Sequence, residues 1–138
     1  MKRGATTTLL VLLMACGTAQ AADWVSIAKA NGGKQEFAVD VSTILASGDI
    51  RRAWVKSTFA PRTMRAPHSW TKWWAYNLAR EAFNCAEETY SKEALTIHYE
   101  DGTVLLVTDE PLPTPWIPVA PESVLDAEMK FLCAWKLK

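Results

Sequence analysis

Residue types that could carry out catalytic chemistry are few in this chain of 138 residues. Its two histidines, His68 and His98, have no nucleophile or carboxylate at a recognisable motif spacing. The adjacent acidic pairs at 87–88 and 109–110 would point to opposite faces of a strand, which makes them poor acid and base partners. The sequence also lacks a glycine-rich phosphate loop and a spaced set of metal ligands. We therefore predict a protein that is not an enzyme and that has no cofactor or metal.

Charged side chains are distributed unevenly along the chain. From Ile50 to Arg80 there are seven basic residues and no acidic one, whereas from Glu81 to Glu128 there are eleven acidic residues against Lys92 alone. One interpretation is that neighbouring strands pair these charges across a sheet. The other is a basic patch that attracts an anionic partner. Its members would be Arg51, Arg52, Lys56, Arg62, Arg65 and Lys72.

Tryptophan and arginine lie close together within the same basic stretch. These two residue types are enriched in the hot spots of protein interfaces. We predict a ligand surface that contains Arg62, Arg65, Trp70, Lys72 and Trp73. The alternative is that most of the seven tryptophans belong to the core, because a soluble domain cannot expose all of them.

The first 21 residues have the organisation of a secretory signal peptide. Lys2 and Arg3 form a positive tip, an apolar run follows at 9–15, and small residues lead to the A-x-A site at 19–21. The apolar run is shorter than the roughly 20 residues that a membrane span needs. Cys16 also ends a sequence similar to a lipobox, so two products are predicted. Cleavage after Ala21 gives a soluble protein, and lipidation of Cys16 gives one anchored to a membrane.

Cysteine content predicts one disulfide. Of three cysteines, Cys16 is either removed or lipidated, which leaves Cys85 and Cys133 in an oxidising compartment. Residues 22–138 fit one domain. Their charge is 13 basic minus 15 acidic residues, or −2, because two basic residues leave with the signal. This balance gives no support for binding of nucleic acid.

Short β-branched and aromatic segments separated by turn residues are typical of an antiparallel β protein. The expected strands cover 24–28, 35–39, 51–60, 70–85, 89–99 and 103–108. Turns are expected at 31–33 and at Asp101-Gly102, and a short helical turn at 40–44. Residues 70–85 fit a helix as well as a strand by periodicity. His98 would be a half-buried structural residue of its strand.

A C-terminal helix follows an extended, proline-rich connector at 110–121, which we expect to be poor in hydrogen bonds. It would begin at Pro121 or Ser123 and would place Cys133 on its apolar face, together with Leu125, Met129 and Leu132. The disulfide would then attach this helix to a strand that ends at Cys85.

Several short motifs occur in a characteristic order. They are Trp24, FAVD at 37–40 with Ile44, AWVK at 53–56, NC at 84–85, Tyr90, YEDG at 99–102, and PESV at 121–124 with Cys133. In this order they resemble the surface-adhesin protein E-like family of Gram-negative bacteria, across nearly all of residues 22–138. Glu122 stands where glycine is common in that family.

This resemblance implies an α+β fold in which an antiparallel sheet of about six strands holds a C-terminal helix through a disulfide of this kind. It favours the strand interpretation before Cys85. It also implies a location in the periplasm, the outer membrane or the cell surface, and its founding member binds host matrix proteins.

Two binding functions follow as hypotheses. The first is an exported envelope module that binds a protein or an envelope polymer. The second is a periplasmic inhibitor of a cell-wall hydrolase, since such inhibitors are also small, exported and closed by a disulfide. An exposed edge strand could pair two copies into a homodimer.

Overall fold

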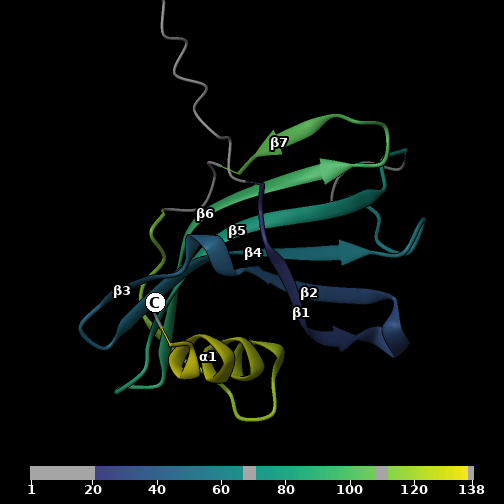
Figure 1. The fold of residues 1–138 in the computed structure, drawn as a ribbon. Helices are drawn as coiled ribbons and strands as arrows, with labels where there is room; N and C mark the ends of the chain where they lie inside the picture. The colour runs from purple at the N-terminus through teal and green to yellow at the C-terminus, as the bar shows by residue number, and fades with distance from the viewer. Residues whose placement is uncertain (1–20, 67–70, 108–111, 137–138) are drawn as a thin grey trace, which may run out of the picture.

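Residues 21–66, 71–107 and 112–136 are described by the structure, which is a computed structural model. The expected cleavage segment before Ala21, Cys16, His68 and Trp70 lie outside these residues. Figure 1 shows a curved β-sheet with a helix against one of its faces. The elements are β1 (Trp24–Ala30), β2 (Gln35–Asp40), β3 (Leu45–Ser47), β4 (Ile50–Phe59), β5 (Trp74–Asn84), β6 (Thr89–Tyr99), β7 (Val104–Leu106), β8 (Ile117–Pro118) and α1 (Val124–Ala134).

The strands form one antiparallel sheet in the order β1-β2-β4-β5-β6-β7, with β3 paired to β4 and β8 paired to β6. The predicted fold class is confirmed, and all six expected strands are present. The sheet has eight strands rather than about six, because two short segments also pair. In β3, Ala46 pairs with Arg51, and in β8, Ile117 pairs with Tyr90.

The proline-rich connector is better hydrogen-bonded than its sequence suggests. Thr114 exchanges backbone and side-chain hydrogen bonds with Ser91 and Lys92 of β6, at distances between 2.6 and 2.8 Å. Prolines lack an N–H group, but the residues between them keep theirs. The expectation of a connector poor in hydrogen bonds is therefore wrong at Thr114 and at β8.

The segment before Cys85 is a strand, as the family resemblance implies. It begins at Trp74, and it pairs with β4 on one side and β6 on the other. The two turns are also confirmed, since β1 joins β2 through a 3-10 turn at Asn31–Gly33, and Gly102 has a φ of 82° between β6 and β7. A second 3-10 turn covers Val41–Thr43, and the Asp40 carboxylate caps it by accepting from the Ser42 N–H.

Helix α1 begins after Ser123, whose hydroxyl accepts a hydrogen bond from the Asp126 N–H at 3.1 Å. Capping by serine supplies a partner to an N–H group that the helix leaves unpaired. Met129 and Leu132 are buried on the face of α1 that meets the sheet. The core they join also holds Val39, Ile44, Ala53, Val55, Phe83 and Val119.

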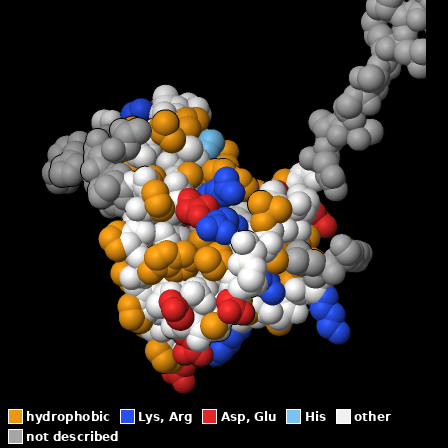
Figure 2. Space-filling view, turned by 90° about the vertical axis from the view of Figure 1, so that its left-hand side faces the viewer, with side chains coloured by type: hydrophobic (Ala, Val, Ile, Leu, Met, Phe, Trp, Pro, Cys, Tyr) orange, Lys and Arg blue, Asp and Glu red, His pale blue; other side chains and the backbone are white. Residues whose placement is uncertain are grey.

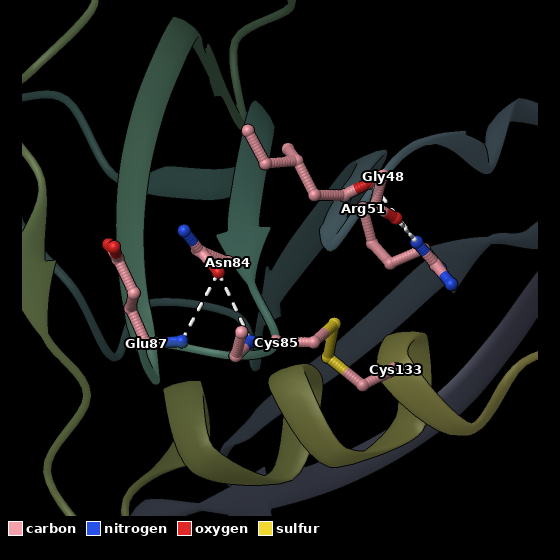
Figure 3. Close-up of a disulfide and its surroundings, with 8 residues drawn as sticks. Gly48, Arg51, Asn84, Cys85, Glu87 and Cys133 are labelled. Carbon is pink, nitrogen blue, oxygen red and sulfur yellow. Dashed lines mark hydrogen bonds between the residues drawn. A yellow bond between two sulfur atoms is a disulfide. The ribbon is translucent and has the colours of Figure 1, made fainter.

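The predicted disulfide joins Cys85 and Cys133, with their Cα atoms 5.8 Å apart. Cys85 directly follows β5, and Cys133 lies in the last turn of α1, as Figure 3 shows. The Asn84 side-chain oxygen accepts from the N–H groups of Ala86 and Glu87, which fixes the turn after the cysteine. The bond therefore attaches the C-terminal half of α1 to the end of a central strand.

Candidate functional site

Four of the five predicted ligand-surface residues lie together at one end of the sheet. We call Arg62, Arg65, Lys72 and Trp73 the arginine–tryptophan surface. The Arg65 guanidinium lies 4.4 Å from the centre of the Trp73 ring, and the two residues form an isolated β-bridge. A guanidinium over an indole face is a favourable cation–π arrangement. The fifth residue, Trp70, lies outside the described residues.

Contacts with the turn between β6 and β7 hold this surface in place. The Arg62 N–H donates to the Glu100 carboxylate at 2.7 Å, and the Glu100 N–H donates to the Trp73 carbonyl at 2.9 Å. The Lys72 ammonium donates to the Thr103 hydroxyl at 2.7 Å and lies 3.5 Å from the Asp101 carboxylate. These contacts attach both segments of the surface, 62–65 and 72–73, to the turn between β6 and β7.

A hollow of about 320 Å³ adjoins the arginine–tryptophan surface. Arg62 lies on its border, opposite residues from the turn between β1 and β2. Its other lining residues are Asn31, Lys34, Gln35, Phe59, Thr63 and Met64. The Arg62 and Arg65 side chains are exposed, and Met64 is 37% exposed. A partner would thus meet the Arg62 guanidinium beside a recess whose lining is mostly polar.

The other basic residues of the predicted patch do not join this surface. Arg52 of β4 and Arg80 of β5 both pair with Glu93 of β6, at 2.8 and 3.2 Å, so charges are paired across three adjacent strands here. Lys56 lies over the Trp24 ring at 4.6 Å. Figure 2 shows a face on which basic side chains lie beside acidic ones. The hypothesis of a six-residue basic patch is therefore wrong in its extent.

Arg51 lies at the opposite end of β4 from the arginine–tryptophan surface. Its guanidinium donates to the Gly48 carbonyl at 2.8 Å (Figure 3). A strand of this length separates the two ends by about 30 Å. The sequence placed these residues in one stretch, but the extended strand keeps them apart.

Neither the histidine nor the tryptophans of the described part form a catalytic arrangement. His98 is half-buried in β6 and stacks on Tyr76, with ring centres 4.2 Å apart, as expected of a structural residue. Of the six tryptophans that the structure describes, Trp116 is 43% exposed and the others are half-buried. None of the six belongs to the buried core, and Trp135 packs against it. Within the described ranges, no three His, Cys, Asp or Glu side chains gather as a metal site requires.

A pair of buried carboxyl groups was missed by the reasoning from sequence. Glu81 of β5 and Glu128 of α1 are 6% and 2% exposed, and their side chains are hydrogen-bonded to each other. Burial raises the pKa of Glu81, and burial together with Glu81 raises the pKa of Glu128 to about 10. The sequence spacing could have revealed the buried position of Glu81. Glu81 lies two residues from both Ala79 and Phe83, so it shares their buried face of β5. Glu128 likewise occupies the apolar face of α1.

Comparison with known proteins identifies the group to which the chain is related. The family model described as surface-adhesin protein E matches residues 24–134, which include the arginine–tryptophan surface and both disulfide cysteines. This chain belongs to the surface-adhesin protein E family. Membership points to an exported, non-enzymatic binding protein of the cell surface. No curated protein sequence matches this chain.

Solved structures of Haemophilus influenzae protein E share the fold. One has 13% identity and a TM-score of 0.55, over 79% of this chain and 83% of that one. Its selenomethionine form has 13% identity and a TM-score of 0.52, over 71% and 78% of the two chains. A second crystal form has 12% identity and a TM-score of 0.51, over 71% and 80%. In the part of the adhesin E chain that the structure describes, no helix is long and apolar enough to cross a membrane.

Proposed function

We propose that this protein is an exported binding module of a Gram-negative cell envelope that recognises a protein or an envelope polymer through the arginine–tryptophan surface. Its location would be the periplasm, the outer membrane or the cell surface, with a membrane anchor only if Cys16 is lipidated. Family membership supports the binding role. The observation that carries the choice of surface is the Arg65 guanidinium on the Trp73 ring, with Arg62 exposed beside it.

The chemistry of this surface suits an anionic partner. Arg62 and Arg65 present planar groups that form paired hydrogen bonds with carboxylates and phosphates. In the adjoining hollow, Met64 is exposed for apolar contact, whereas Phe59 is buried. The hollow is lined mainly by polar and basic side chains, so this surface would orient a partner chiefly through charge and hydrogen bonds.

The first test compares Arg62→Ala/Arg65→Ala with Arg51→Ala/Lys136→Ala, which removes the same charge away from the surface. Wild type and variants are immobilised and exposed to a cell-envelope extract, and each captured component is quantified. We expect the surface variant to lose about tenfold or more of at least one component, since truncation of a hot-spot arginine commonly costs more than 1.4 kcal/mol. The control variant keeps that component.

A second arm distinguishes a polymer from a protein partner. Purified peptidoglycan sacculi are sedimented with each variant, and the bound protein is measured. Loss of co-sedimentation in the surface variant alone indicates a polymer ligand, and loss only in the extract arm indicates a protein ligand. Equal retention by both variants in both arms would contradict the proposed surface.

A further inference from the structure

The carboxyl pair of Glu81 and Glu128 joins the helix to the sheet at a buried point. A carboxylate oxygen only accepts hydrogen bonds, so a hydrogen bond between two carboxyl groups requires that one of them carry a proton. The second oxygen of each group, Oε2, is also buried and has no hydrogen-bond partner among the described residues. Ionisation of both groups would therefore place two charges together without donors to solvate them.

Charges around the pair balance one ionised carboxylate and not two. From β6, Lys92 is the register partner of Glu81 and attracts both carboxyl groups, and half-buried Tyr90 lines the same region. The residues that β2 and β4 contribute there are uncharged, namely Gln35, Phe37, Val55 and Ser57. Burial and the neighbouring Glu81 raise the pKa of Glu128 to about 10, so the pair keeps a shared proton at neutral pH.

Helix α1 is attached unequally along its length. Its C-terminal half has the buried Met129 and Leu132 and the disulfide at Cys133. Its N-terminal half has the half-buried Val124 and Leu125, which border a cavity of about 360 Å³ between helix and sheet. Glu128 lies between the two halves of α1. Its hydrogen bond to Glu81 is therefore the polar contact with the sheet that lies nearest the N-terminal half.

We propose that the proton shared by Glu81 and Glu128 is a latch that holds the N-terminal half of α1 on the sheet. Loss of the proton lets this half detach while the disulfide retains the other. A detached half-helix does not persist in water, since a few residues cannot sustain helical hydrogen bonds alone. Detachment would uncover the cavity side chains of Trp74, Leu95 and Leu125.

The direction of the pH dependence follows from the raised pKa values. Unfolded glutamates titrate near 4.5, and the folded pair holds its proton to higher pH. The stabilisation from the pair is therefore complete below about pH 4.5 and is lost as the pH rises toward 10. The latch is closed in acid and at neutral pH, and it opens in alkali.

Amide hydrogen exchange of the exported, oxidised protein tests the latch. Rates are measured between pH 6.5 and 9.0 by quenched labelling and mass spectrometry, and are corrected for the intrinsic pH dependence of exchange. The amides of 126–128 should lose protection by about tenfold per pH unit, because each unit raises the deprotonated fraction tenfold below the pKa. The amides of 132–134 should keep theirs.

Two conservative variants make the result specific. Glu128→Gln places an amide donor opposite Glu81, and Glu81→Gln does the same opposite Glu128, so each should hold the helix without a titrating proton and remove the pH dependence at 126–128. Glu93→Gln, on a carboxylate paired with Arg52 and Arg80, should behave as wild type. Parallel loss of protection in both halves, no loss in either half, or an unchanged slope in the two glutamine variants would each overturn the proposal.

Discussion

Glu122, immediately before the N-cap of α1, has a backbone conformation that suits glycine. Its φ is 60°, its side chain is exposed, and its N–H donates to the Asp126 carboxylate at 2.9 Å. A residue with a Cβ costs roughly 1–2 kcal/mol in this left-handed region. The family resemblance implies glycine at this position, and the positive φ of Glu122 is a backbone conformation that glycine adopts readily.

Substitution Glu122→Gly should therefore raise the free energy of unfolding by up to about 1 kcal/mol, after the entropy that glycine adds to the unfolded chain is subtracted. Urea unfolding followed by tryptophan fluorescence measures the change. A matched control is Glu87→Gly, an exposed loop glutamate whose φ is not positive. That variant should lose stability, and a gain of equal size in both would contradict the explanation from backbone conformation.

At the scale of elements, one covalent bond, a small apolar core and the buried carboxyl pair attach α1 to the sheet. The disulfide closes a separation of 48 residues. Closing a loop of this length restricts the unfolded chain by about 4 kcal/mol in the loop-entropy model. This is a large part of the 5–15 kcal/mol by which domains of ordinary size are stable.

Removal of the disulfide by Cys85→Ala/Cys133→Ala should lower the free energy of unfolding by about 4 kcal/mol. The measurement is urea unfolding of the exported protein with and without a reducing agent. Wild type should approach the double variant when reduced, and the double variant should not respond to the reducing agent. A wild-type protein indifferent to reduction would show that packing alone holds α1.

At the scale of the whole molecule, one curved sheet carries the helix on one face (Figure 1). The arginine–tryptophan surface lies at one end of this sheet. The family match covers 24–134, so residues 1–21, which we propose to be a signal peptide, lie outside the matched region. Processing of that segment would decide whether the protein is soluble or anchored to a membrane.

Intact mass spectrometry of the exported protein should find a chain that begins at Ala22 and lacks two hydrogens through the disulfide. The reason is that the A-x-A site ends at Ala21, and Cys85 and Cys133 are then the remaining cysteines. A chain that begins at a lipidated Cys16 would instead show an anchored protein. Reduction should add the two hydrogens to either product.

The sequence by itself determined the local features of the fold. The turn at Asp101-Gly102, the capped helix after Ser123 and the strand Thr89–Tyr99 follow from short-range propensities. The disulfide also followed, because exclusion of Cys16 left one pairing. The turn, the helix cap and the strand depend on residues adjacent in the chain, and the disulfide depends on the number of cysteines.

Only the tertiary structure decided which distant side chains meet. Arg52 and Glu93 are 41 residues apart and form an ion pair, which removes Arg52 from the predicted basic patch. Glu81 and Glu128 share a buried site although each belongs to a different element. The physical reason is that charge pairing and desolvation depend on distance in space, and β-sheet register with helix docking fixes that distance after local structure has formed.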